Sequence, residues 1–101
     1  MSKFHQKRRD KMGIISEILQ IAQKEVLKTQ IMYRANLSFA QLNDYLSSMI
    51  TSGLLAKVIR KNGFVYLSTQ KGRNFLRKFR EISCLLDSED ENSPVYLRSL
   101  V

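Results

Sequence analysis

The sequence has few of the residues on which metal sites and common catalytic sites depend. Its 101 residues include one cysteine, Cys84, and one histidine, His5. A single cysteine excludes an internal disulfide framework, and together with one histidine it leaves too few soft ligands for a zinc site of ordinary composition. His5 lies among lysines and arginines, with no nucleophile beside it in any motif. We therefore expect no enzyme activity, no metal and no cofactor.

Long hydrophobic runs are also missing. No apolar stretch approaches the roughly 20 residues that a transmembrane helix needs. The N-terminal segment MSKFHQKRRDKM is basic, but an amphipathic stretch follows it where a signal peptide would have an apolar block. We expect an intracellular, cytoplasmic protein that is not embedded in a membrane.

Acidic residues are scarce over most of the chain. There are 17 Lys and Arg against 9 Asp and Glu, which gives a formal net charge of +8 and a pI of about 9.9. Residues 1–36 carry a net charge of +5 (8 basic, 3 acidic), residues 37–82 carry +6 (8 and 2), and residues 83–101 carry −3 (1 and 4). A positive excess of this size indicates an acidic partner such as a nucleic acid.

Composition also predicts how the chain is divided. With 44% hydrophobic residues, a chain of this length can fill the core of one domain. The only proline lies in the acidic segment DSEDENSP, residues 87–94, which is typical of a linker. We expect a basic arm over residues 1–10, a folded domain over residues 11–86, and an acidic linker with an apolar tail over residues 87–101.

Three helices are predicted in the first half of the chain. Apolar residues recur at helical spacing from residue 14 onward, which predicts a helix over residues 11–24. Thr29 is the expected N-cap of a short second helix that ends at Ala35-Asn36. Ser38 and Gln41 have the spacing of a capping box, and the third helix that they begin runs to the glycine at position 53. The second and third helices are therefore only a few residues apart.

A β-hairpin and a last helix follow. Asn62-Gly63, between two runs of aliphatic, β-branched and aromatic residues, is the strongest short hairpin signal in the chain. Thr69 is the expected cap of a last helix that stops near Leu86, and Gly72 in its first turn weakens its start slightly. The element order is helix, helix, helix, hairpin, helix, which is a mainly α fold with a small β-hairpin (α+β).

This order is that of a winged helix-turn-helix. In such a domain three helices bury one shared core, the third helix exposes its outer face to the major groove of DNA, and the hairpin tip brings cations to the flanking phosphates. Another three-helix domain with a hairpin would show the same order, and that alternative stays open at this point.

The sequence also resembles a known family. The segment KTQIMYRANLSFAQLNDYLSSMITSGLL, residues 28–55, followed by FVYLSTQKGRNFLRKFREI, residues 64–82, resembles the small archaeal winged-helix proteins that include the ten-kilodalton Sulfolobus DNA-binding protein and the ArnR-like regulators. The residues that agree in order and spacing with the family's segment between helices two and three are Lys28, Thr29, Ile31, Met32, Tyr33, Ala35, Asn36, Leu37 and Ser38. The resemblance covers about residues 11–83. It implies binding of double-stranded DNA by a homodimer whose last helices pair as an antiparallel coiled coil.

Candidate phosphate contacts lie on several parts of such a fold. The N-terminal arm supplies Lys7, Arg8 and Arg9, although a solubilising leader is an alternative role for it. The other candidates lie on the second helix, on the hairpin and at the start of the last helix: Lys28, Thr29, Tyr33, Arg34, Arg60, Lys61, Asn62, Lys71 and Arg73. Contacts with phosphates carry no sequence information, so these residues predict affinity more than selectivity.

The third helix has no Lys or Arg between Ser38 and Ser52, so arginine reading of guanine is absent. Gln41 and Asn43 have amides that can pair bidentately with adenine, which predicts a preference for A·T pairs. Ser38 and Ser47 are further outward candidates on this helix. The alternative is that this face is merely solvated.

The last helix carries an apolar stripe that a winged-helix core covers only in part. Phe75, Phe79, Ile82 and Leu86 recur at spacings of four, three and four, as in the a and d positions of a coiled coil. A second copy of the helix is expected to cover the stripe, because a two-fold interface is self-complementary. The competing cover is the chain's own apolar end, residues 95–101. Cys84 is expected on the apolar side, packed in the core or the interface rather than acting as a redox sensor.

Two functions fit these observations. The first is a double-stranded DNA-binding protein, either a transcriptional regulator or an architectural protein, with the helix over residues 38–52 in the major groove. The second is a winged-helix module that docks another protein, for which an exposed apolar patch would replace the basic face. The net charge of +8 favours DNA.

Overall fold

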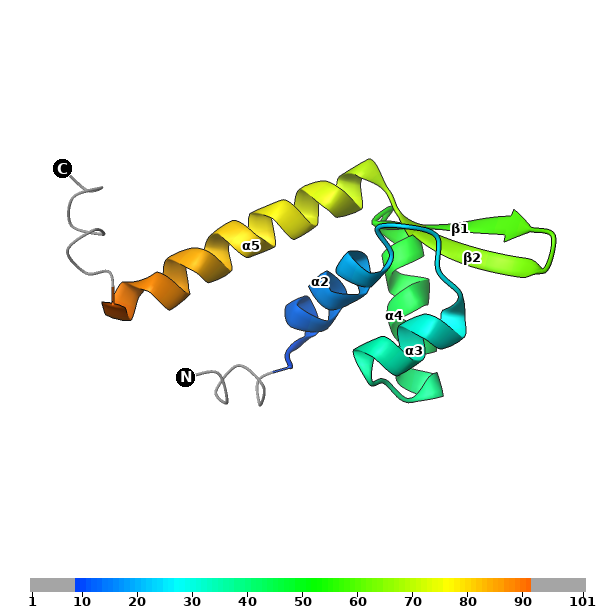
Figure 1. The fold of residues 1–101 in the computed structure, drawn as a ribbon, viewed down its shortest axis with the longest axis horizontal. Coiled ribbons are helices and arrows are strands. Elements are labelled where there is room, and N and C mark those ends of the chain that lie inside the picture. Colours follow the sequence, from blue (N-terminus) through cyan, green and yellow to red (C-terminus); the bar gives the residue numbers. More distant parts are fainter. Residues whose placement is uncertain (1–8, 92–101) are drawn as a thin grey trace.

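The computed structural model describes residues 9–91. The elements are α2 (Lys11–Ile21), α3 (Lys28–Ala35), α4 (Phe39–Thr51), β1 (Leu55–Arg60), β2 (Gly63–Ser68) and α5 (Gln70–Glu91). This order confirms the predicted succession of three helices, a hairpin and a helix. The hairpin projects from one end of the molecule and α5 from the other, with the three shorter helices between them (Figure 1). No helix in these residues is long and apolar enough to cross a membrane.

Helix α2 begins as its sequence indicates but ends before the predicted residue 24. The Asp10 side chain caps it by accepting a hydrogen bond from the Gly13 amide at 2.8 Å. After Ile21 the chain turns so that Val26 can pair with Tyr66 of β2 through two backbone hydrogen bonds of 3.1 and 2.8 Å. The helix stops early because this long-range pairing uses the residues that follow it.

Helix α3 begins one residue before the predicted cap. Leu27 occupies the N-cap position, and its amide donates to the Gln30 side chain at 2.8 Å. Thr29 lies in the first turn with an exposed side chain, so its assignment as the N-cap is wrong. The helix ends as predicted, at Asn36, whose left-handed φ of 54° is tolerated by asparagine better than by most residues.

Helix α4 has the predicted capping box. The Gln41 amide donates to the Ser38 hydroxyl at 3.1 Å, and the Ser38 amide donates to the Gln41 side-chain oxygen at 3.0 Å. At its other end Gly53 has a φ of 83°, which lets the chain reverse into β1. Both ends of α4 are therefore fixed by short-range sequence signals.

The hairpin is confirmed, with a small shift in its turn. Arg60 pairs with Gly63, so the two turn residues are Lys61 and Asn62, and Gly63 opens β2 at a φ of 122°. The antiparallel register continues through Lys57 opposite Tyr66 to the end of the hairpin next to the helices.

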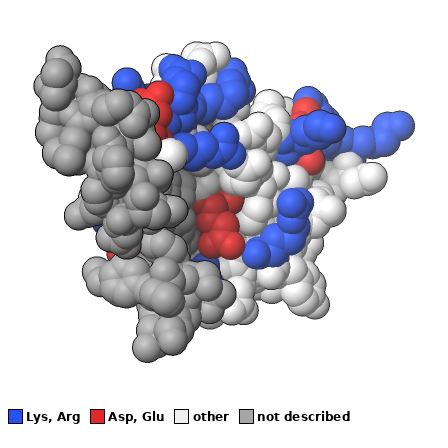
Figure 2. Space-filling model, turned by 60° about the vertical axis from the view of Figure 1, so that its left-hand side comes forward, with Lys and Arg blue, Asp and Glu red and all other residues white. Residues whose placement is uncertain are grey.

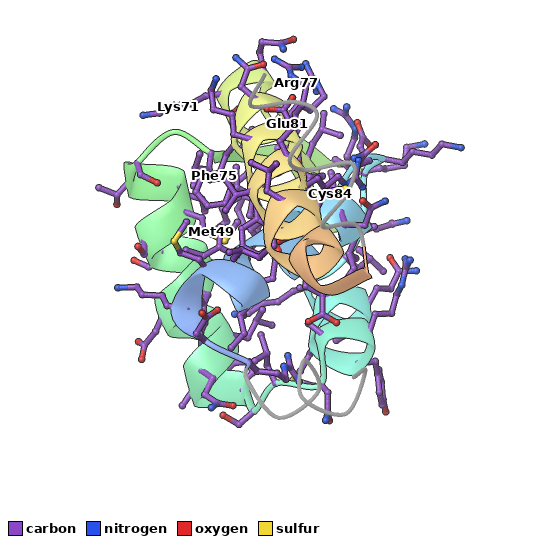
Figure 3. The ribbon with its side chains drawn as sticks, turned by 90° about the vertical axis from the view of Figure 1, so that its left-hand side faces the viewer. Met49, Lys71, Phe75, Arg77, Glu81 and Cys84 are labelled. Atoms are coloured by element: carbon purple, nitrogen blue, oxygen red, sulfur yellow. The ribbon has the colours of Figure 1, made fainter. Side chains whose placement is uncertain are left out.

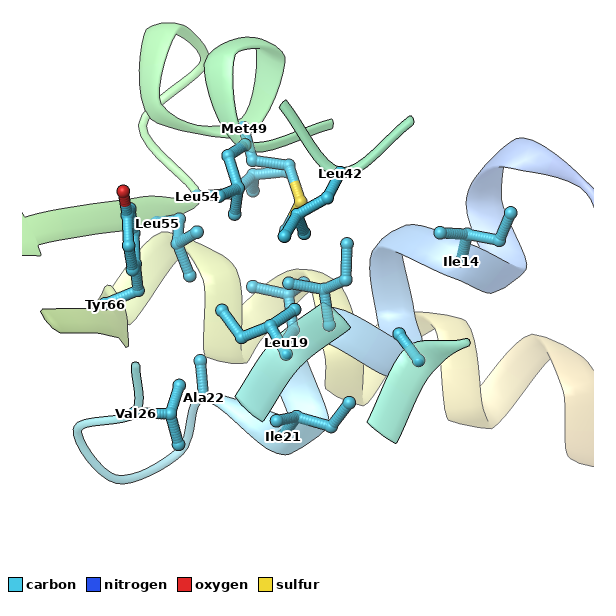
Figure 4. Packing of buried hydrophobic residues seen from close by; sticks show 14 of the residues in the cluster. Ile14, Leu19, Ile21, Ala22, Val26, Leu42, Met49, Leu54, Leu55 and Tyr66 are labelled. Atoms are coloured by element: carbon cyan, nitrogen blue, oxygen red, sulfur yellow. The ribbon is translucent and has the colours of Figure 1, made fainter. Parts of the chain in front are cut away.

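One hydrophobic core joins α2, α3, α4, the base of the hairpin and the start of α5 (Figure 4). The side chains buried most completely in it are those of Ile18, Leu19, Ile31, Leu42, Met49 and Leu55. Ser68 is buried among them, and its hydroxyl donates to the Leu19 carbonyl at 2.9 Å, so its burial leaves no unsatisfied donor.

Helix α5 crosses the core closely at its start. Thr69 caps it by accepting from the Gly72 amide at 3.0 Å. A Cβ on Gly72 would lie 2.2 Å from the Leu54 carbonyl oxygen, so the glycine permits this crossing rather than merely weakening the helix. The helix continues to Glu91, five residues beyond the predicted stop near Leu86. The change from basic to acidic residues does not end the helix, because acidic residues, unlike proline and glycine, are compatible with a helix interior.

Candidate nucleic-acid interface

Basic side chains are spread over the molecule in separate groups. Figure 2 shows several such groups on one face, with a smaller number of acidic side chains between them. The sequence alone suggested one basic surface made by the second helix, the hairpin and the start of the last helix. The contacts of the individual cations show which of them a polyanion can reach.

A groove lies between α4 and the hairpin. Its volume is about 350 Å³. The residues that line it are Lys28, Asn43, Leu46, Ser47, Ile50, Thr51, Lys57 and Tyr66. Leu46 and Tyr66 are buried and Ile50 is half-buried, whereas two ammonium groups, two hydroxyls and one amide come from the other positions. This combination of a cationic rim with neutral donors suits an anionic backbone.

The two lysines of the groove each lie over an aromatic ring. The Lys28 ammonium is 4.6 Å from the centre of the Phe39 ring, and the Lys57 ammonium is 4.2 Å from the centre of the Phe64 ring. Cation–π contacts hold a lysine in place without occupying it with a hydrogen-bond acceptor. The N–H groups of both lysines remain able to bind a phosphate.

Lys57 is a functional candidate that the sequence analysis missed. It lies on the same face of the hairpin as Tyr66, its cross-strand partner. The alternation of side chains along β1 shows that Lys57 is on this face once the register of the hairpin is known. Its position beside Lys28 depends on how the hairpin packs against α3 and α4, which no local pattern supplies.

The two predicted base readers on α4 are not brought together. Residues two positions apart on a helix differ by about 200° in direction, so Gln41 and Asn43 lie on opposite flanks. Asn43 and Ser47 line the groove. The Gln41 side-chain oxygen accepts from the Ser38 amide in the capping box, so both Gln41 and Ser38 are engaged in holding the helix end.

The remaining candidates on α3 and the hairpin turn are exposed. Thr29, Arg34, Lys61 and Asn62 all have solvent-accessible side chains, and Tyr33 exposes most of its ring. None of them lines the groove, and Lys28 is the residue through which α3 reaches it.

Arg60 is engaged by an acidic residue that the sequence analysis did not consider. Its guanidinium binds Glu25 through both side-chain oxygens, with Nε to Oε1 at 3.1 Å. This hydrogen bond lowers the pKa of the Glu25 carboxyl and raises the pKa of Arg60. Both groups are exposed, so the pair stabilises the fold little. It does reduce the positive charge that Arg60 offers to DNA.

Three other cations are bonded to backbone carbonyls or acidic side chains of the protein. The Arg9 guanidinium donates to the Ala35 carbonyl and to Glu17, the latter at 3.3 Å. Lys71 donates to the Ser52 carbonyl at 2.7 Å, which places its ammonium at the C-terminal end of α4. Arg73 donates to the Ser68 carbonyl at 3.0 Å. Lys7 and Arg8 lie outside the described residues.

The apolar stripe on α5 is buried only near the core. Phe75 and Phe79 are half-buried, and their rings stack with centres 6.5 Å apart. Further along, the side chains of Ile82 and Leu86 are 52% and 64% exposed.

Cys84 is not on this stripe. It is exposed and lies on the side of α5 opposite Phe75, as Figure 3 shows. Nine helical positions separate the two residues, which corresponds to about two and a half turns. The expectation of a cysteine on the apolar side was therefore wrong. The helical spacing from Phe75 already indicates the opposite side.

Comparison with known proteins settles the family. The model of the winged helix-turn-helix family matches residues 8–87. The chain belongs to this family. In its terms α3 and α4 are the helix-turn-helix, α4 occupies the position of the recognition helix, and β1 with β2 is the wing.

Two curated relatives come from the archaeon Methanocaldococcus jannaschii. The chain is 39% identical to the uncharacterized protein MJ0290 over 80 residues, which span 78% of this chain and 36% of that protein. It is 30% identical to the uncharacterized protein MJ0287 over 83 residues, which span 81% of each chain. The chain thus matches about a third of the length of MJ0290 and most of MJ0287.

Solved structures show the same winged-helix fold. One is Sso10a-2, a DNA-binding protein from Sulfolobus solfataricus, with 24% identity and a TM-score of 0.68 over 88% of this chain and 97% of that chain. Another is the PcaV transcriptional regulator from Streptomyces coelicolor, with 14% identity and a TM-score of 0.71 over 98% of this chain and 85% of that chain. At these identities the likeness is one of fold.

Proposed function

We propose that this winged-helix protein binds double-stranded DNA in the cytoplasm, as a transcriptional regulator or an architectural protein. The observation that carries the proposal is the groove between α4 and the wing, where Lys28 and Lys57 both line the wall and the buried Leu46 and Tyr66 lie among the lining residues. DNA binding by Sso10a-2 and transcriptional regulation by PcaV are properties of proteins with this fold, and they support the proposal.

The groove accounts for affinity. With α4 in the major groove, one DNA strand passes between α4 and the wing, and its phosphates meet the ammonium groups of Lys28 and Lys57. The Ser47 and Thr51 hydroxyls in the same groove add neutral hydrogen bonds. Lys61 at the tip of the wing and the basic arm over residues 1–10 extend the contact along the backbone.

Selectivity comes from α4 and is modest. Its outward face presents no Lys or Arg. Asn43 is the amide best placed for an adenine edge, because Gln41 would have to leave or share its bond with the Ser38 amide to do the same. We therefore propose a weak preference for A·T pairs over a large sequence-independent component.

The protein acts as a homodimer in this proposal. Ile82 and Leu86 expose apolar area along one line of α5, beyond the half-buried Phe75 and Phe79. A second copy of α5 covers this line with identical side chains and places two recognition helices on one duplex. The domain boundaries at residues 10 and 86 stay predictions.

A salt titration tests the groove directly. Each phosphate contact contributes about −0.9 to the slope of log affinity against log salt concentration. Lys28→Gln and Lys57→Gln should each make the slope shallower by about 1 and weaken binding to all sequences alike. Lys78→Gln removes the same charge from an exposed position on α5 that does not line the groove, so it should leave the slope unchanged. Equal slopes in wild type and all three variants would refute the groove as the phosphate site.

A further inference from the structure

The outer end of the wing exposes two large apolar side chains side by side. Ile59 is 73% exposed and Phe64 is 48% exposed, and they are direct partners across β1 and β2. They lie one residue pair before the turn, where the two-stranded hairpin extends beyond the body of the molecule (Figure 1). Adjacent exposed apolar groups on a projecting element commonly mark a binding surface.

These two side chains share a face with the wall of the groove. Side chains alternate along a strand, so Ile59 and Lys57 of β1 face the same way, as do their partners Phe64 and Tyr66 of β2. Lys57 and Tyr66 line the groove. The surface that meets the DNA backbone therefore continues outward along the wing into an apolar tip.

The geometry of a duplex decides what the tip meets. Each backbone strand separates the major groove from the minor groove. If α4 lies in the major groove and a strand passes through the groove beside the wing, the next surface along the wing is the minor groove. The tip is narrow, with a two-residue turn, and a minor groove about 6 Å wide admits only a slender element.

The charges around the pair match this location. Lys57 lies over the Phe64 ring, and Lys61 occupies the turn beyond it. An apolar centre with cations at its edges complements a minor groove, where sugars and base edges lie between two rows of phosphates. A protein partner would have to present carboxylates around an apolar socket to match the same pattern.

We propose that Ile59 and Phe64 form a wedge that enters the minor groove, partly unstacks a base step and bends the duplex. The proposal rests on the proposed DNA binding and adds a deformation to it. Apolar wedges of this kind kink DNA by about 20 to 90°. Flexible pyrimidine–purine steps such as TA should be bound better than a stiff A-tract, because they unstack at a lower cost.

The test is a bend measurement on short duplexes labelled at both ends for energy transfer, one with central TA steps and one with an A-tract. The variant is Ile59→Thr with Phe64→Thr, since threonine keeps the strand preference and removes the apolar bulk. The matched control is Val58→Thr with Val65→Thr, a cross-strand pair on the opposite face of the same hairpin. Circular dichroism checks that each variant is folded. If the double variant is unfolded, the single variant Ile59→Thr is used in its place.

Saturating wild-type protein and the control should raise energy transfer on the TA duplex and bind it several-fold more tightly than the A-tract. The wedge variant should lose most of the change in energy transfer and the preference for TA steps, while its salt slope stays that of wild type. A bend that persists in the wedge variant, or wild-type binding with no bend, refutes the wedge and leaves DNA binding intact. A change in the sedimentation of the DNA-free wedge variant also refutes it, since the pair would then belong to a protein interface. Failure of wild type to bind any duplex refutes the proposed function itself.

Discussion

At the scale of single residues, the contacts of each cation decide what it can offer to DNA. Arg9, Arg60 and Lys71 already bind oxygens of the protein. Lys28 and Lys57 lie over aromatic rings, which position them and leave their donors accessible. Formal charge along the sequence therefore overstates the positive charge that Arg60 leaves exposed, and it gives no sign that Lys57 lines the groove.

Removing the carboxylate beside Arg60 should strengthen DNA binding. Glu25→Gln keeps the size of the side chain but no longer neutralises the Arg60 guanidinium, which then gains a phosphate contact. We expect tighter binding at low salt and a slope steeper by about 1 in a salt titration. Glu81→Gln, which removes a carboxylate from an exposed position on α5 that does not line the groove, is the control and should leave the slope unchanged.

The pH dependence of the pair gives an independent check. The pKa of the Glu25 carboxyl is lowered from 4.5 in the folded chain by its hydrogen bond with Arg60. The pair therefore stabilises the fold above about pH 4.5 and loses that small contribution as the pH falls through the lowered pKa. A Glu25 carboxyl that titrates at 4.5 or above, followed by NMR, would show that the pair does not form.

At the scale of elements, local signals predicted the ends of helices where neighbours in sequence supply the partners. The Ser38–Gln41 capping box and the left-handed Asn36 are such cases, and both are found. The end of α2 and the role of Gly72 at the start of α5 were not predicted. Pairing of Val26 with Tyr66 shortens α2, and the close approach of Gly72 to Leu54 sets how α5 crosses the core. Both contacts join residues that are far apart in the chain.

The two amides at the start of α4 should respond differently to truncation. Gln41→Ala removes half of the capping box, so we expect a loss of about 0.5 to 2 kcal/mol in unfolding free energy. Its effect on DNA binding should be small. Asn43→Ala should leave stability nearly unchanged and cost about 1 to 3 kcal/mol on a preferred A·T-rich site, with less effect on random DNA.

Chemical denaturation and DNA titration of the same two variants separate these effects. The reverse pattern, with Gln41 affecting selectivity and Asn43 affecting only stability, would show that the capping bond opens on DNA. If Asn43→Ala loses the same binding free energy on preferred and on random DNA, Asn43 contacts the DNA backbone and not a base.

At the scale of the whole molecule, the length and direction of α5 matter most for the proposed dimer. Its 22 residues extend about 33 Å at 1.5 Å per residue, and the helix leaves the body of the protein well before its end (Figure 1). The sequence indicated the apolar stripe but placed Cys84 on it. The periodicity of the helix places Cys84 on the opposite side, and the structure agrees (Figure 3).

A charge on the stripe should separate the dimer. Ile82→Glu would bury a carboxylate without a partner in the interface, so we expect the variant to sediment as a monomer at concentrations where wild type is dimeric. Cys84→Glu adds the same charge on the opposite side of the helix and should remain dimeric. Sedimentation of wild type as a monomer, or dimers of Ile82→Glu as stable as those of wild type, would contradict the interface.

The central claim is that DNA lies between α4 and the wing, and an NMR titration of the labelled protein with a short duplex tests it most directly. We predict that amide and side-chain signals of Asn43, Ser47, Thr51 and Lys57 shift together as DNA is added, followed by those at the wing tip. Signals of the α5 stripe from Ile82 to Leu86 should change little. Shifts confined to α5, or an unchanged groove in the presence of bound DNA, would contradict the account.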